Sequence, residues 1–214
     1  MKTIKYLLSC FLIIGSCNNP KSDYKNVTSN TQDINFYELV EVVNYDDLTK
    51  INLSIPKFLN KVTPPNEKTI FQYTYFEDKS GYMVSMDKLS SRNTQKLSDK
   101  EYIDLTNKGF KNDLGGDLSA IEKILPPTMK NVKVVQFEGN LIINDKYFLK
   151  RVSYYNDQSL VGTILEDVNC TEFHFVTLHN KKKYSLNIVY WGDDKDVSSL
   201  IGLFNTVGGS VKFE

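Results

Sequence analysis

The sequence predicts an α+β fold in which an antiparallel β-sheet is flanked by two or three helices. Its strand-like segments come in neighbouring pairs joined by short polar turns, which is the pattern of antiparallel hairpins. Its helix-like segments cluster in the middle and at the end of the chain and do not alternate with the strands, which argues against a parallel sheet. The length of 214 residues allows one domain with a tail.

Two pairs of segments define the predicted hairpins. Residues 69–76 (TIFQYTYF) and 81–86 (GYMVSM) alternate in polarity and form the first pair. Residues 172–178 and 184–191 form the second pair around a turn at 180–182. Further strands are expected at 50–55, which Pro56 ends, at 132–138, at 146–155 and at 210–213, with 139–145 as a turn or a third short strand.

The first predicted helix has a complete start signal. Ser98 can cap a helix, Glu101 follows three residues later, and Leu97 can pack onto Tyr102. We expect this helix to run to about residue 112. A short second helix is expected at 119–125, because two prolines follow it directly.

The last predicted helix has the most regular apolar period in the chain. Asp193 or Asp194 can cap its start, and Gly208 with Gly209 can end it. The residues of its apolar face are Val197, Leu200, Ile201, Phe204 and Val207.

The first 16 residues have the features of a secretory signal. Lys2 and Lys5 precede an apolar run from 6 to 14, which is too short to span a membrane, since a span needs about 20 residues. Residues 14–17, Ile-Gly-Ser-Cys, resemble the lipobox of bacterial lipoproteins. That resemblance implies that Cys17 receives a diacylglyceryl group and becomes the new N-terminus. The alternative is a plain cleaved signal peptide followed by an incidental cysteine.

The predicted domain organisation follows from this signal. Residues 1–16 are the signal peptide, 17–33 a flexible polar tether and 34–214 a single α+β domain. Cys10 leaves with the signal, and acylated Cys17 cannot form a disulfide. Cys170 then has no disulfide partner in an oxidising compartment, so we expect its thiol to be buried.

Three alternate residues, Cys170, Glu172 and His174, form the one cluster of reactive side chains in the sequence that is a candidate for a metal or catalytic site. On a strand they share one face and could supply zinc ligands or a thiol–imidazole pair. Residues two apart on a strand are about 6.5 Å apart and converge poorly on one ion. A solvated or helix-covered strand face is therefore the favoured interpretation, and we expect no catalytic residue, metal or cofactor. His179 falls on the opposite face.

Three other features receive structural interpretations. Asp193, Asp194 and Asp196 lack the loop of a calcium site and suit the first turn of a helix. The run Lys181–Lys183 is interpreted as a solvated turn, with contact to anionic lipid as the alternative. The 13 Tyr and 12 Phe indicate sheet packing more than a stacking surface for sugars or bases.

Two short motifs resemble the PsbP/Mog1-like α/β/α sandwich proteins. Residues 53–58 (LSIPKF) resemble the opening strand of that group, in which a proline is followed by an aromatic residue. The helix from Asp194 and the segment 210–213 (SVKF) resemble its closing helix and strand. Phe58 stands where the family often has tryptophan. The resemblance spans residues 50–214 in element order and implies a sheet flanked by helices in a binding or assembly module.

Balanced charge limits the classes of function. With 26 basic and 26 acidic side chains, the chain lacks the net positive charge of a nucleic-acid binder. The leading hypothesis is a non-catalytic lipoprotein of the cell envelope, bound to membrane lipid through Cys17, that binds another envelope protein; whether it sits on an inner or outer membrane is left open. The alternative is a small-ligand carrier that uses a cleft between sheet and helix. An enzyme ranks third.

Overall fold

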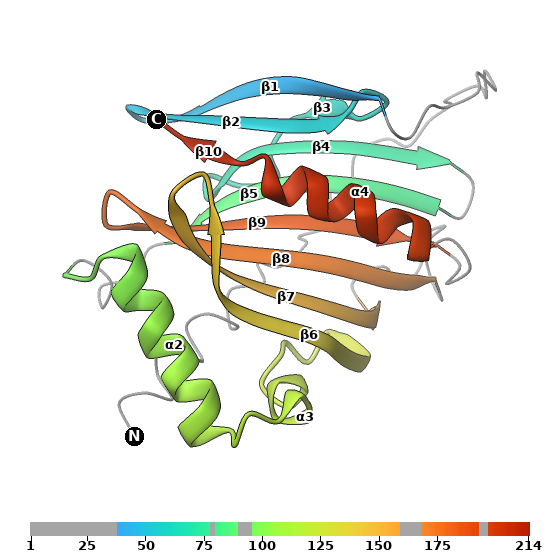
Figure 1. The fold of residues 1–214 in the computed structure, drawn as a ribbon. Coiled ribbons are helices and arrows are strands. Elements are labelled where there is room, and N and C mark those ends of the chain that lie inside the picture. The colour runs from blue at the N-terminus through green and yellow to red at the C-terminus, as the bar shows by residue number, and fades with distance from the viewer. Residues whose placement is uncertain (1–37, 78–79, 90–95, 159–167, 193–196) are drawn as a thin grey trace.

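The computed structural model describes residues 38–77, 80–89, 96–158, 168–192 and 197–214. These described residues form a seven-stranded sheet, a three-stranded sheet and three helices, and all of their strand pairs are antiparallel (Figure 1). This arrangement confirms the predicted α+β class. In spatial order the large sheet comprises β3 (Asn60–Val62), β4 (Thr69–Glu77), β5 (Ser80–Leu89), β9 (Lys182–Trp191), β8 (Asn169–His179), β7 (Lys146–Asp157) and β6 (Met129–Ile143). The small sheet comprises β1 (Leu39–Asp46), β2 (Thr49–Pro56) and β10 (Lys212–Phe213).

Helices and the small sheet cover the two faces of the large sheet. Helix α4 (Val197–Gly209) and β2 pack on one face, where their apolar side chains meet Phe173 and Phe175 of β8. Helices α2 (Asp99–Asp113) and α3 (Leu118–Glu122) pack on the other face, against Val176 and Trp191. The central strands β8 and β9 are consequently buried on both sides along nearly their whole length. Among the described residues, no helix is long and apolar enough to cross a membrane.

Strand β6 differs from the sequence prediction. The segment 139–145 is predicted to be a turn or a third short strand, but β6 continues through it as one strand to Ile143. Its pairing with β7 is irregular between Glu138 and Leu141, where Asn140 has a φ of 67°. The glycine and asparagine therefore mark a β-bulge, which bends a strand without ending it. The reversal comes later, at Asn144 and Asp145, which both have positive φ as in a two-residue hairpin turn.

Several element boundaries also differ. Strands β1 and β3 have no counterpart among the predicted strands, and the final strand joins the small sheet and not the large one. The second helix is shorter than expected and begins from the cap Asp117. Helix α4 extends through Gly208 and Gly209, which were expected to follow it. A Cβ at Gly208 would lie 2.2 Å from the ring of Phe175, so glycine allows close packing there. The predicted cap residues Asp193, Asp194 and Asp196 lie outside the described residues.

The first long helix matches its prediction. Ser98 caps α2, and the side chain of Glu101 accepts a hydrogen bond from the Ser98 backbone, which completes the capping box. Leu97 and Tyr102 belong to the same apolar cluster. Sequence alone thus locates this helix start, because the signal is local.

The lysine run at the β8–β9 turn is solvated only in part, which corrects the expectation. Asn180 and Lys181 form the turn with φ values of 47° and 63°. Lys182 pairs with Asp47 at 2.6 Å, and Lys183 is fully buried, with its ammonium 5.7 Å from the ring centre of Tyr102. The strand begins at Lys182, so alternation directs Lys183 into the core.

A buried aspartate joins the two sheets. Asp46, at the end of β1, accepts hydrogen bonds from Lys88 at 2.5 Å and from the Tyr184 hydroxyl at 2.8 Å, and pairs with Lys182 at 3.3 Å. Burial by itself would raise the pKa of Asp46, but the hydrogen bonds from its three donors outweigh that effect and lower it. Its stabilisation is therefore present at neutral pH and is lost as pH falls through the lowered pKa.

We expect Asp46→Asn to lower the free energy of unfolding by about 2 kcal/mol at neutral pH, because two buried charge-assisted hydrogen bonds weaken. Urea denaturation measures the change. Asp47→Asn is the matched control, since Asp47 is 70% exposed in its side chain and its loss should change stability by no more than about 0.5 kcal/mol. Equal effects of the two substitutions would contradict the role given to Asp46.

Candidate functional site

The three residues singled out in β8 lie on the α2 face of the sheet. Cys170, Glu172 and His174 are each at most 1% exposed, while Phe173 and Phe175 belong to the opposite apolar cluster. The predicted shared face and the predicted burial of Cys170 are therefore confirmed. Within the described part of the chain, no group of three or more His, Cys, Asp or Glu side chains could hold a metal ion.

Glu172 and His174 have structural partners. Glu172 accepts hydrogen bonds from the buried guanidinium of Arg151 and, at 3.3 Å, from the hydroxyl of Ser153. The Nε2 atom of His174 lies 2.6 Å from the Ser185 hydroxyl. Burial, with the charge of Arg151, holds the pKa of His174 well below its usual value, so its ring is neutral at pH 7. A neutral, buried imidazole of this kind supports packing.

This polar row continues across the sheet toward β4. Ser185 donates to Asn187 at 3.4 Å, Asn187 donates to Asp87 at 3.3 Å, and Thr69 donates to Asp87 at 2.7 Å. Burial raises the pKa of Asp87. The row is thus a set of buried polar groups on one face of the sheet that hydrogen-bond to one another, although Nδ1 of His174 has no hydrogen-bond partner among the described residues.

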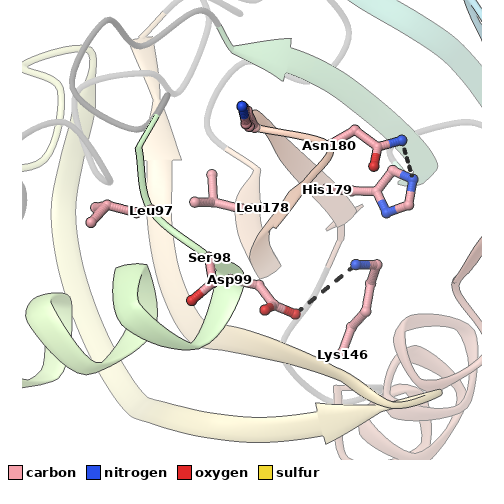
Figure 2. Close-up of a pocket in the computed structure, with 8 residues that line it drawn as sticks. Leu97, Ser98, Asp99, Lys146, Leu178, His179 and Asn180 are labelled. Atoms are coloured by element: carbon pink, nitrogen blue, oxygen red, sulfur yellow. Dashed lines mark hydrogen bonds and ion pairs between the residues drawn. The ribbon is translucent and has the colours of Figure 1, made fainter.

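A first pocket, of about 320 Å³, opens where α2 begins and the β8–β9 turn ends (Figure 2). Asp99 and Lys146 point toward each other across it, with 4.0 Å between their charged atoms. The Nδ2 atom of Asn180 lies 3.0 Å from Nε2 of His179, whose ring stacks on Phe213 at 5.1 Å. Burial and the charge of Lys146 lower the pKa of His179. Lys146 and His179 thus already have partners within the fold.

A second pocket, of about 430 Å³, lies between the β6–β7 hairpin and the C-terminal part of α4; we call it the α4 cleft. Figure 1 shows the end of this hairpin curled toward the side of the sheet that carries α4. Its lining is mostly apolar on the strand side and polar at the helix and turn. The lining residues are Leu141, Ile142, Ile143, Asn144, Lys150, Phe175, Asn205 and Gly209.

Lys150 is the charged group of the α4 cleft. It is 6% exposed, and its ammonium donates a 2.7 Å hydrogen bond to the side-chain oxygen of Asn205. The ammonium also lies 5.5 Å from the ring centre of Phe173. Among the described residues, no carboxylate lies within 4.0 Å of this ammonium. Burial lowers the pKa of Lys150, and the charge of Glu138, opposite it on β6, offsets that effect only in part.

Lys150 and Asn205 were not among the candidate site residues predicted from the sequence. Lys150 and Arg151 form a basic pair inside a strand whose neighbours are Leu149 and Val152. Alternation places the two basic residues on opposite faces, and both faces of this sheet are covered. A basic pair in the middle of an otherwise apolar strand was the sequence signal that could have indicated a buried charge at Lys150. The contribution of Asn205 comes from the docking of α4, which no local pattern contains.

A scan of protein-family models and a search of curated proteins found no match to this sequence. Among solved structures, the fold is similar to PsbP (CyanoP) of Synechocystis sp. PCC 6803, at 12% identity and a TM-score of 0.48 over 89% of this chain and 99% of that chain. It is also similar to LpqN of Mycobacterium tuberculosis, described as involved in cell envelope biogenesis, at 10% identity and a TM-score of 0.46 over 82% and 90%. The Ran-binding protein Mog1p of Saccharomyces cerevisiae has 10% identity and a TM-score of 0.42 over 82% and 95%. At such identities and scores, neither the activities nor the partners of these proteins transfer to this chain.

We expect Glu172→Gln to destabilise the fold by about 3 kcal/mol or more, because it removes the buried carboxylate that Arg151 contacts. Chemical denaturation of both proteins gives the difference. The matched control is Asp104→Asn, which breaks the exposed Lys100–Asp104 pair on α2 and should change stability by about 0.5 kcal/mol or less. A variant as stable as the unchanged protein would show that Glu172 has no structural role.

Proposed function

We propose that this protein is a lipid-anchored, non-catalytic binding module of the cell envelope. The observation that carries this proposal is the sequence Ile14-Gly15-Ser16-Cys17 at the end of the apolar run, followed by polar residues from 17 to 33. Lipid chains on Cys17 would hold the protein at a membrane, each buried CH₂ contributing about 0.8 kcal/mol. Fractionation of the cell membranes would identify the membrane that carries the protein.

The polar segment gives the proposed anchor a working distance. As a flexible coil, residues 17–33 would span a root-mean-square distance of roughly 20–25 Å. That distance would let the domain contact an envelope protein that projects only a short way from the same membrane. The tether thus favours partners bound to, or lying close to, the membrane surface.

The chemistry of the described groups supports a binding role over a catalytic one. The buried histidine contacts Ser185, the buried glutamate contacts Arg151, and the half-buried His179 contacts Asn180 and stacks on Phe213. A general acid or base needs a pKa near the working pH and access to its substrate. His174 suits neither requirement, since it is buried and its pKa is held well below the usual value, and His179, whose pKa is also lowered, is engaged by Asn180 and Phe213.

A second candidate function is that of a small-ligand carrier, and the α4 cleft is the observation that favours it. The cleft has the size typical of small-molecule sites, which is about 300–1,000 Å³. It combines apolar walls with few polar groups, which is the usual composition of such sites.

We expect Cys17→Ser to abolish lipid attachment, because a serine hydroxyl cannot take the place of the thiol as acceptor. Mass spectrometry of the protein from its own membranes should show residues 17–214 plus a diacylglyceryl group, and the variant should lack that mass and leave the membrane fraction or stay unprocessed. Cys10→Ser, within the signal, is the matched control and should be processed normally. A variant with unchanged mass and membrane association would refute the anchor.

Native mass spectrometry of the membrane-extracted protein separates the two candidate functions. A binding module should carry the mass of a second protein at a fixed ratio, whereas a carrier should carry a small mass that denaturation removes. The small mass should disappear in a variant whose α4 cleft is filled. Cross-linking in intact cells that recovers only the protein itself, together with no extra native mass, would count against both functions.

A further inference from the structure

We propose that the α4 cleft binds an aliphatic carboxylic acid of medium chain length, with the carboxylate on the Lys150 ammonium and the chain along Leu141 and Ile143. The inference rests on the second candidate function and names the chemical class of its ligand. Geometry carries it: a buried cation and an apolar wall occur in one cleft.

The buried charge of Lys150 favours an anionic ligand. Taking an ammonium out of water is costly unless an anion and hydrogen bonds compensate it. Lys150 has a neutral amide oxygen as its hydrogen-bond partner, and Glu138 acts on it only at longer range. Among the described residues, one other lysine is at most 6% exposed. It is Lys183, which lies on the opposite face of the sheet, away from the cleft. Lys150 therefore offers the positive site that an anionic ligand group would complete.

The hydrogen-bond donors around the Lys150 ammonium favour a carboxylate. A lysine ammonium has three donors, and Asn205 accepts one of them. The Asn205 side chain also carries an amide NH₂ group, which can donate to an oxygen bound nearby. Two donors from Lys150 and one from Asn205 suit the two oxygens of a carboxylate. A phosphate dianion would bring a second negative charge that the single cation of the cleft cannot balance.

The apolar wall of the α4 cleft favours an aliphatic chain on the ligand. Leu141, Ile143 and Phe175 line it on the strand side, while alternation along β6 directs the side chain of Ile142 to the other face of the strand. An aliphatic chain laid along Leu141 and Ile143 would gain roughly 25 cal/mol per Å² of apolar surface buried. The chain of the acid would therefore run from Lys150 outward across these residues.

Photoaffinity labelling tests this assignment on the mature lipidated protein in nanodiscs. The probe is decanoic acid with a diazirine at the end of its chain, and the adduct is located by mass spectrometry. We expect the adduct at residues 141–143 or at Phe175. Unlabelled decanoate should compete for labelling, and 1-decanol, which has the same chain without the charge, should compete roughly tenfold less well or worse.

Two pairs of variants make the test specific. Lys150→Met should reduce decanoate competition by roughly tenfold or more, while Lys150→Arg should retain most of it. Gly209→Phe places a ring at the lining of the cleft and should reduce or abolish labelling; the change is sterically tolerated, because a Cβ at Gly209 meets nothing within 4 Å and its φ is not positive. Gly202→Phe, the same change at an equally open position of α4, should label as the unchanged protein does.

A stability measurement separates a ligand site from a purely structural lysine. Lys150→Met replaces the side chain by an unbranched apolar one that is a single heavy atom shorter and removes the desolvated charge, so its unfolding midpoint in urea should be equal or higher while labelling falls. A lower midpoint with unchanged labelling would overturn the proposal. Labelling spread over the surface, or equal competition by decanol, would overturn it as well.

The outcomes also distinguish this inference from the functions on which it depends. A different small mass held in the cleft would preserve the carrier function and reject the acid. Loss of every cleft adduct, with a diacylglyceryl mass on Cys17 and a protein partner in native spectra, would reject the carrier and leave the binding module standing.

Discussion

The fold depends on one constraint, which is that strands β8 and β9 are covered on both faces. Every polar side chain on these strands therefore needs a partner inside the protein, because an unpartnered buried polar group is costly. On the α2 face, the solution is a row of hydrogen bonds that runs from Glu172 and His174 across to Asp87. On the α4 face, the solution is apolar packing, with Phe173 and Phe175 against the helix. The two faces are thus chemically different, although the same strands supply both.

Lys150 and Arg151 show how sharply this difference acts. The two residues are neighbours in β7 and are directed to opposite faces, and both are buried. Arg151 meets a carboxylate, so its charge is matched within the polar row. Lys150 enters the apolar face, where Asn205 supplies only a neutral oxygen. Burying an ammonium without an anionic partner is costly, so the placement of Lys150 beside an open cleft favours the binding of an anionic group there.

The sequence predicts what is local and misses what is assembled at long range. The start of α2 is fully encoded by Ser98 and Glu101, and both hairpins follow from alternation and turn residues. Strand β1 was missed although its sequence, LVEVVNYD, is largely apolar; it lies at the edge of the small sheet and pairs with β2. The bulge near Asn140 was taken for a break, since glycine and asparagine signal both. The shared face of Cys170, Glu172 and His174 was predictable from strand parity, whereas their partners lie on β7 and β9.

The α4 cleft depends on contacts between opposite ends of the domain. Its turn residue Asn144 donates to the Val211 carbonyl at 2.9 Å, which fixes the β6–β7 hairpin to the segment after α4. That segment is held in turn by Ser210, whose hydroxyl accepts from the backbone of Ser54 in β2 at 2.9 Å. Strand β2 pairs with β1, the first described strand after the predicted tether. The cleft is therefore tied to the small sheet, in which β2 lies between β1 and β10, and a ligand bound in the cleft would stabilise these contacts together with the rest of the folded domain.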